Sequence, residues 1–402
     1  MTRKQIIIAS AHPFMADMRL GTSYLSEALC KLGWDVLYIE QPTSPLHLCH
    51  PGARQVSWKK TKGALRLLSG EIQTFRFGDG HLTLFQTIVP WPHINMPLLR
   101  GEHMLNHWWR YALPRLSTVM KKLDLTSPVA FLTDSPYFYS LAKHLGLPTI
   151  YRYADRIQYF SEITPTLLAK QRSVLDTCSL VLYTSKAMQA DLSERNGMTS
   201  YLPNGVNTSL YEKPYAEPPE LNHIAKPRII YSGTLGPWLD VAAIRAAAAA
   251  LPDKQFVLLG KATMNHPELQ GLSNIHFIGT VPHFRVPEFL QHSQVGIIPF
   301  DMLNQAEFVK AINPLKLYEY CAAGLPVVSY ISEETTKPGD LINYYRTPED
   351  FVASICDALE RPDTEEILRK KWAREMSWDS RANELQRLIN RLDEFSATSE
   401  HI

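Results

Sequence analysis

The chain has 402 residues, of which 45% are hydrophobic and 20% charged, so it is globular and long enough for two domains. Its net charge of +1 gives no overall polarity that favours nucleic acid. The five cysteines are scattered without a C-x-x-C pair or a Cys/His cluster, which predicts reduced thiols and no metal site. The apolar run at the N-terminus is short and ends at His12, and no stretch could cross a bilayer, so we expect a cytoplasmic protein.

The N-terminal half alternates strands and helices, which predicts a doubly wound parallel sheet. Its expected strands cover residues 5–10, 34–40, 129–133, 149–153 and 179–184, and its expected helices cover 22–32, 137–144, 164–177 and 186–196. The first loop, residues 12–21, has no G-x-G-x-x-G and gives no support to a dinucleotide site. Ligands bind such sheets at the carboxyl ends of the strands, and here these ends carry Asp134, Asp155, Ser185 and Asn204.

Asp155 is a candidate general base. It lies just past an expected buried strand, between Arg152 and Arg156. The alternative is an aspartate that caps the following helix or pairs with one of these arginines.

Residues 51–122 carry an uneven share of the charge. The segment holds eleven Lys or Arg against three acids, and four of the eight tryptophans: Trp58, Trp91, Trp108 and Trp109. Basic residues interleaved with Trp suit the headgroup region of an anionic membrane, so we expect a peripheral membrane surface here. The alternative is a solvated basic face with ordinary core aromatics. No nucleic-acid motif accompanies the segment.

A turn at residues 203–207, with Asn204 and Gly205 at its centre, predicts a domain boundary. We expect an N-terminal domain of residues 1–205, joined by a C-terminal helix at 378–402, and a second doubly wound domain of residues 206–377. Gly233 and Thr234 follow the first strand of the second domain, where glycine lets backbone approach a ligand. His283 and Arg285 could touch a base or phosphate, but solvated loop residues explain them as well.

Residues 313–329 predict a helix followed by a strand. Asn313 is the expected N-cap, Pro314 the first helical residue, and Gly324 the end. Lys316 lies in the first turn, where a diphosphate would be bound by both the ammonium and the helix N-terminus. Glu319 and Tyr320 share the face of Lys316, and the carboxylate could accept hydrogen bonds from sugar hydroxyls. An ordinary core helix with a Lys–Glu pair is the alternative.

Together these segments resemble the glycosyltransferases of the GT-B fold, in which two Rossmann-like doubly wound domains face a central cleft. Residues 203–207 resemble the N-G-V-(D/N) element of family 4 enzymes, and residues 319–328 are similar to their E-x-x-A-x-G-x-P-V-V segment. Ala311 stands where retaining members carry a first glutamate. Residues 151–155 and 315–320 are similar to the Y-R-x-x-D and M-K-L-x-x-Y motifs of the inverting, xanthan-type glucuronosyltransferase family, which works on a lipid-linked acceptor.

The resemblance implies a transferase that moves a sugar from a nucleoside-diphosphate sugar to a glycan or lipid-linked acceptor, with inversion and without metal or cofactor. It implies that Asp155 is the base, that Lys316 binds the phosphates, and that Phe300 and Thr280 match donor-site residues of the glucuronosyltransferase. The other expected donor-binding residues are Glu319, Gly233, Thr234, Tyr320 and Asn204, and the expected acceptor-binding residues are His12, Arg19 and Asp134. A sugar-nucleotide epimerase of the same fold and a non-catalytic nucleotide-sugar or membrane-binding protein stay open as alternatives.

Overall fold

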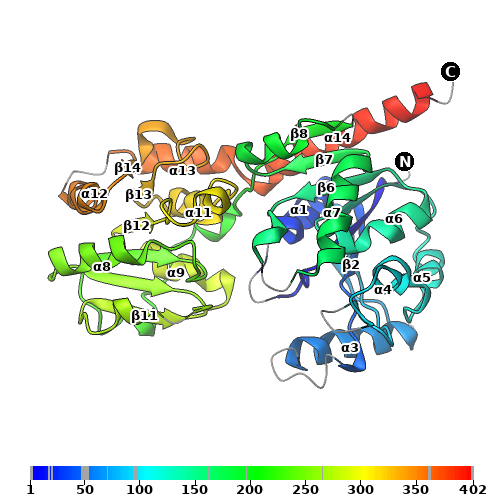
Figure 1. Ribbon diagram of the computed structural model, residues 1–402, viewed down its shortest axis with the longest axis horizontal. Helices are drawn as coiled ribbons and strands as arrows, with labels where there is room; N and C mark the ends of the chain where they lie inside the picture. Colours follow the sequence, from blue (N-terminus) through cyan, green and yellow to red (C-terminus); the bar gives the residue numbers. More distant parts are fainter. Residues whose placement is uncertain are drawn as a thin grey trace. The chain divides into compact units, whose positions relative to one another are not determined.

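The structure is a computed structural model that describes residues 3–16, 19, 21–46, 54–69, 71–93, 98–160, 163–195, 197–264, 266–360 and 364–399. The chain divides into two compact units (Figure 1). Unit 1 comprises residues 1–184, 188–202 and 381–402, and unit 2 comprises residues 185–187 and 203–380. The expected boundaries at residues 205 and 378 lie a few residues from these. Among the described residues, no helix is both long and apolar enough to cross a membrane.

Unit 1 is built on a sheet with the strand order β3-β4-β2-β1-β5-β6-β7-β8, in which only the β3–β4 pair is antiparallel. The strands are β1 (Gln5–Ser10), β2 (Asp35–Glu40), β3 (Thr74–Phe77), β4 (Gly80–Phe85), β5 (Pro128–Thr133), β6 (Thr149–Tyr153), β7 (Leu180–Tyr183) and β8 (Met198–Tyr201). The helices are α1 (Gly21–Lys31), α3 (Arg54–Leu68), α4 (Glu102–His107), α5 (Leu116–Lys122), α6 (Tyr139–Leu145), α7 (Pro165–Thr177) and most of α14 (Trp378–Ser399).

The central parallel strands of unit 1, such as β1, β2, β6 and β7, are buried on both faces. Ile7, Leu37 and Phe131 face α4, α5 and α6 in one core cluster. Their neighbours Ile6 and Ile8 point to the other face and are also fully buried. There the indole of Trp34, just before β2, donates a hydrogen bond of 2.8 Å to Gln386 of α14. The expected helix at 186–196 is instead a 3-10 helix at Lys186–Leu192, and β8, β3 and β4 were not expected from the sequence.

Unit 2 has a fully parallel sheet with the strand order β11-β10-β9-β12-β13-β14. Its strands are β9 (Arg228–Ser232), β10 (Gln255–Leu259), β11 (Ile275–Gly279), β12 (Val295–Ile298), β13 (Val327–Tyr330) and β14 (Asn343–Tyr345). Its helices are α8 (Val241–Ala250), α9 (Val286–Gln291), α10 (Ala306–Val309), α11 (Leu315–Ala323), α12 (Pro348–Glu360) and α13 (Glu366–Glu375).

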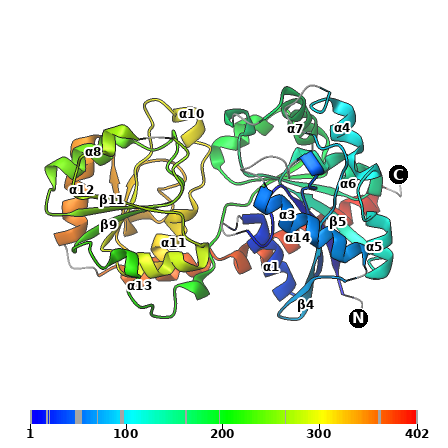
Figure 2. The ribbon, with the colours of Figure 1, turned by 90° about the horizontal axis from the view of Figure 1, so that it is seen from below.

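Alternation along β9 shows how the sequence covers both faces of this sheet. Ile229 and Tyr231 pack on α8 and α12, whereas Ile230 packs on α9, α11 and α13. Figure 2 shows α8 and α12 on one side of the sheet and α11 and α13 on the other. Both units are therefore doubly wound parallel sheets, as the sequence predicts.

Candidate functional site

The strand order of unit 2 locates a candidate binding edge. The chain builds the sheet outward from β9 through β10 to β11, and then in the other direction from β12 through β13 to β14. The direction changes between β9 and β12, which is where doubly wound sheets bind ligands, beyond the carboxyl ends of the strands. Gly233 follows β9 at this point, and Phe300 follows β12.

Two glycines, Gly233 and Gly260, expose their backbone at the edge next to β9. Gly233 has φ of 141° and Gly260, just after β10, has φ of 146°, a region that side-chain-bearing residues rarely adopt. The Gly233 N–H donates to the Leu259 carbonyl at 2.8 Å, which joins the two loops. A Cβ on Gly260 would lie 2.0 Å from the Gly233 oxygen, so only glycine fits there. Gly260 is a feature that the sequence reasoning missed.

Lys316 lies beside this backbone, in the first turn of α11. Its Nζ is 3.3 Å from the Tyr231 hydroxyl oxygen and 4.4 Å from the centroid of the Tyr231 ring. A Cβ on Gly233 would be 3.1 Å from Nζ, so the ammonium faces the glycine backbone directly. Because the N-terminal end of a helix already carries partial positive charge, this corner of unit 2 favours an anion.

Glu319 lies one turn further along α11 and is paired with a histidine. The Nε2 atom of His283 is 2.6 Å from Glu319 Oε1, and the two side chains are only 19% and 11% exposed. His283 begins a short 3-10 helix, His283–Arg285, between β11 and α9. The sequence left open whether His283 is a solvated loop residue. The structure excludes that interpretation, because the side chain is largely buried and paired with Glu319.

Arg285 has different partners. Its guanidinium binds Glu288 through Nε at 3.0 Å and Glu220 through both terminal nitrogens at 2.8 and 3.1 Å. These two carboxylates hold Arg285, and with it the 3-10 helix, against the rest of unit 2. We assign Arg285 to support of the loop, because its donors are occupied by carboxylates.

Several expected donor-site residues lie behind the edge. Tyr320 is fully buried, and its hydroxyl accepts a hydrogen bond of 2.8 Å from the Ser232 N–H, so it supports the loop before Gly233. Phe300 is 2% exposed and its ring centroid lies 5.5 Å from Lys316 Nζ. The carbonyl of Thr234 accepts from the Tyr231 hydroxyl at 2.8 Å.

Asn313 does not cap α11, contrary to the sequence prediction. The helix begins at Leu315, with Pro314 in the N-cap position and no side-chain cap. The Asn313 Oδ1 atom instead accepts from the Asn204 N–H at 2.9 Å and from the Tyr318 hydroxyl at 3.1 Å, so it is not available to the helix. The Asn204 side chain donates to the Asn313 carbonyl at 2.8 Å. The expected donor residue Asn204 therefore anchors the start of α11.

In unit 1 the strand order changes direction between β1 and β5, and acidic groups lie at this edge. Asp134, after β5, accepts hydrogen bonds from the Ser10 hydroxyl at 2.6 Å and the Ala11 N–H at 3.2 Å. Arg152, on the neighbouring strand β6, is 4% exposed. Burial lowers the pKa of its guanidinium, while the charges of Asp134 and Asp155 oppose that shift.

Asp155 follows β6 and its side chain is exposed. The surrounding protein nevertheless raises the pKa of its carboxyl, with desolvation as the largest cause. Arg152 and His12 lower this pKa and Asp134 raises it. Exposure limits the shift, since an open carboxyl keeps part of its hydration. An accessible carboxyl with a raised pKa has the properties of a general base. The 3-10 helix that follows, Ile157–Tyr159, has Arg156 in its N-cap position and no side-chain cap, so Asp155 does not cap it.

The two other expected acceptor residues differ from each other. The His12 side chain is exposed, and its backbone N–H donates to the Ser10 hydroxyl at 3.1 Å. Arg19 instead forms a 2.9 Å ion pair with Glu27, and its guanidinium carbon lies 4.3 Å from the centroid of the Tyr24 ring. Its interactions are those of a residue that fixes the loop before α1.

The four tryptophans of the basic segment do not share one environment. Trp58 and Trp91 are 51% and 56% exposed, whereas Trp108 is 1% exposed and belongs to the core. Trp109 is half-buried and stacks on His144 with ring centroids 3.9 Å apart. The expectation of a surface that includes all four is wrong for Trp108. Residues 51–53, 70 and 94–97 of the segment lie outside the described residues.

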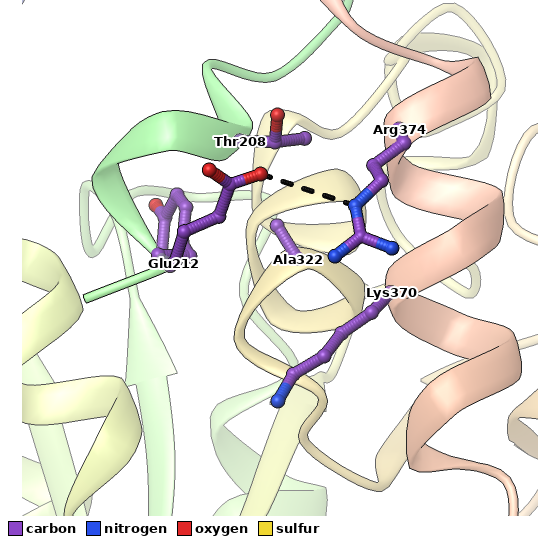
Figure 3. A pocket seen from close by; sticks show the side chains of 6 residues that line it. Thr208, Glu212, Ala322, Lys370 and Arg374 are labelled. Atoms are coloured by element: carbon purple, nitrogen blue, oxygen red, sulfur yellow. Dashed lines mark ion pairs between the residues drawn. The ribbon is translucent and has the colours of Figure 1, made fainter. Parts of the chain in front are cut away.

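A separate cavity of about 390 Å³ opens elsewhere in unit 2, lined by Thr208, Tyr211, Glu212, Ala322, Lys370 and Arg374 (Figure 3). Arg374 points toward Glu212 across it, with Nε 3.9 Å from the carboxylate. None of the expected site residues lines this cavity. In the part of the chain that the structure describes, no three His, Cys, Asp or Glu side chains come close enough to form a metal site.

Two doubly wound units with candidate ligand-binding residues at the carboxyl edges of their sheets define the GT-B fold of glycosyltransferases. Solved structures share this fold. The sucrose-phosphate synthase of Thermosynechococcus elongatus is 16% identical, with 98% of this chain and 100% of that chain covered and a TM-score of 0.64. Anabaena Alr3699/HepE in complex with UDP and glucose is 15% identical, with 97% of this chain and 100% of that chain covered and a TM-score of 0.60. A Rickettsia africae glycosyltransferase is 12% identical, with 98% of this chain and 99% of that chain covered and a TM-score of 0.62.

Residues 241–387 match the model of the family described as glycosyl transferase-like. The protein of Bacillus subtilis (strain 168) named a teichuronic acid biosynthesis glycosyltransferase, TuaH, is 28% identical over 221 residues. That match covers 52% of this chain and 55% of the relative, so the chain spans about half the length of the curated relative it matches.

Proposed function

We propose that the protein transfers a sugar from a nucleoside-diphosphate sugar to an acceptor hydroxyl. One observation carries the proposal: the Lys316 ammonium faces the bare backbone of Gly233 at the positive end of α11. Two phosphates are the anionic group that such a corner accommodates best, because the ammonium and the helix N-terminus favour negative charge and a glycine without a side chain lets a ligand come close. The Anabaena relative was solved with UDP-glucose, which supports a ligand of this class.

In the proposed reaction, an acceptor oxygen attacks the anomeric carbon from the face opposite the diphosphate. The new carbon–oxygen bond forms as the bond to the phosphate oxygen breaks, and the acceptor proton moves to Asp155. The configuration at the anomeric carbon is inverted. Lys316 stabilises the charge that grows on the departing diphosphate, so no step calls for a metal ion. The raised pKa of Asp155 brings its basicity closer to what proton transfer needs.

The proposed acceptor is a glycan precursor, as the name of the Bacillus relative suggests. His12 and Asp134 lie in the same electrostatic environment as Asp155, since both shift its pKa. These two residues, on the loops after β1 and β5, are the proposed contacts for acceptor hydroxyls. Arg19 is less suited to this task, because Glu27 already pairs with it.

A lipid-linked acceptor would bring the protein to a membrane, and α3 supplies a suitable surface (Figure 1). Trp58, Leu65 and Leu68 are between 51% and 52% exposed on this helix. Lys59, Lys62 and Arg66 are exposed beside them, and Lys62 Nζ lies 5.4 Å from the centroid of the Trp58 ring. Apolar side chains flanked by cations suit the interface of an anionic bilayer. We propose that α3 docks there.

The test uses the purified full chain, a panel of UDP-glucose, GDP-mannose and dTDP-rhamnose, and a polyprenyl-diphosphate-linked sugar as acceptor. We expect one donor to give a glycosylated acceptor with inverted anomeric configuration. Asp155→Asn should abolish transfer and retain donor binding, whereas Asp176→Asn, an exposed control on α7, should behave as the wild type. Formation of an isomeric nucleotide sugar without acceptor would instead identify an epimerase. Binding without any turnover would point to a non-catalytic protein.

A further inference from the structure

The pairing of His283 with Glu319 has no part in the reaction as proposed above. The two residues come from different elements, since Glu319 lies on α11 and His283 begins the 3-10 helix after β11. We propose that His283 is a positioning residue for nucleoside recognition: it holds Glu319 through Oε1 and directs Oε2 to the ribose hydroxyls of the donor. This inference rests on the proposed function, because it assigns a partner to the donor carboxylate.

The geometry of the pair fits a positioning role. A separation of 2.6 Å between His283 Nε2 and Glu319 Oε1 is that of a strong, charge-assisted hydrogen bond. The carboxylate is 11% exposed, so few water molecules compete with the imidazole for it. A glutamate on a helix otherwise has several rotamers. Fixing one of them in advance removes an entropic cost that a ligand would bear on binding.

The histidine is itself supported by its neighbours. The next residue but one, Arg285, is bound by Glu220 and Glu288 with distances of 2.8 to 3.1 Å. Pro282 precedes the 3-10 helix and restricts the backbone where the chain enters it. His283 is therefore presented to Glu319 by an anchored segment.

This arrangement separates two parts of donor recognition on one helix. Lys316, in the first turn of α11, faces the glycine backbone and binds phosphate. Glu319, one turn later, binds ribose only if His283 holds it. Removal of His283 should then weaken binding of compounds that carry ribose hydroxyls and leave binding of phosphate groups unchanged.

The experiment measures binding of UDP, 2′,3′-dideoxy-UDP and inorganic pyrophosphate by calorimetry. GDP and dideoxy-GDP replace the UDP pair if the wild type prefers guanine. We expect the wild type to bind UDP at least about tenfold more tightly than dideoxy-UDP, the effect of a hydrogen bond to a charged group. His283→Ala should reduce this preference to about threefold or less, with binding of dideoxy-UDP and pyrophosphate unchanged. His283→Gln, whose Nε2 can also donate to Glu319, should restore part of the preference.

His276→Ala is the matched control, because His276 lies on β11 in the same unit and its Nε2 is 2.8 Å from Gln255. It should keep the wild-type preference for UDP. An unchanged preference in His283→Ala would overturn the inference. So would an equal loss for all three compounds together with a lower melting temperature, because that result indicates a merely structural role. If the wild type binds none of the diphosphates, the proposed function fails first and the inference falls with it.

Discussion

Replacement of Lys316 by methionine removes the ammonium and keeps an unbranched apolar stem over Tyr231. Two unit charges 4 Å apart interact by about 4 kcal/mol at an effective dielectric constant of about 20. Lys316 is only half-buried, so water and salt screen part of this energy. We therefore take about half of it, about 2 kcal/mol, which corresponds to a loss of about 30-fold in affinity for a nucleoside diphosphate.

Stability should change little in the same variant. The lost contact of the ammonium with the Tyr231 ring, at 4.4 Å, is worth about 0.5–1 kcal/mol. Removal of a cation from the first turn of α11 regains about 0.3–1 kcal/mol. Calorimetric titration with UDP and a thermal melt separate the two effects. Lys310→Met serves as control, since the Lys310 side chain is 50% exposed and paired with Glu307. UDP affinity within threefold of wild type in Lys316→Met would refute the reasoning.

Four further predictions address other parts of the molecule. Asp155→Asn should lower transfer by at least about 100-fold, as expected for loss of a general base, while calorimetry finds wild-type donor affinity. The raised pKa of Asp155 means that the folded state binds its proton more tightly than the unfolded state does. Wild-type stability should therefore fall, relative to Asp155→Asn, as pH rises from the ordinary aspartate pKa through the raised one. Melts over that pH range check this, and a constant difference would contradict it. Gly260→Ala should destabilise the chain by about 1–3 kcal/mol in a denaturant titration, because its Cβ would meet the Gly233 oxygen. The control Gly271→Ala also has positive φ but open space around it, and an equal effect in both variants would show that the contact does not matter. Lys59→Glu with Lys62→Glu should weaken binding to phosphatidylserine-containing vesicles more than tenfold, since each cation contributes about 1 kcal/mol. Lys213→Glu with Lys226→Glu, two exposed residues of unit 2, should leave vesicle binding intact, and equal losses in sedimentation would contradict a role for α3.

The central strands of both sheets could be predicted from the sequence because they are short apolar runs between helical segments with clear turn residues. The strands β3, β4 and β8, at the two ends of the first sheet, were not predicted. Lys316 could be placed for the same reason. Pro314 and Gly324 delimit α11, so its first turn is visible in the sequence. Gly233 follows β9 directly and is also recognisable.

The remaining features depend on contacts between distant segments. His283 lies 36 residues from Glu319, and nothing local marks it as a partner. Position 260 must be glycine because the carbonyl of Gly233, at the end of the neighbouring strand, occupies the space that a Cβ would need. Asn313 has the residue type of a helix cap, but Asn204, more than a hundred residues earlier, takes its side-chain oxygen. Trp108 looks like its neighbour Trp109, and only packing against Tyr137 and Phe138 places it in the core.

The central claim is that the edge of unit 2 around Lys316 binds an activated sugar through its diphosphate. Thermal unfolding of the wild type and of Lys316→Met with UDP-, GDP- and dTDP-sugars tests it most directly. A ligand at a free concentration of 100 times its Kd stabilises the folded state by about 2.7 kcal/mol. For a domain of roughly 200 residues, this raises the melting temperature by about 5–10 °C. We expect such a rise for one nucleotide series in the wild type and little or none in Lys316→Met. A wild type that no nucleotide sugar stabilises, or a variant that is stabilised equally, would contradict the claim.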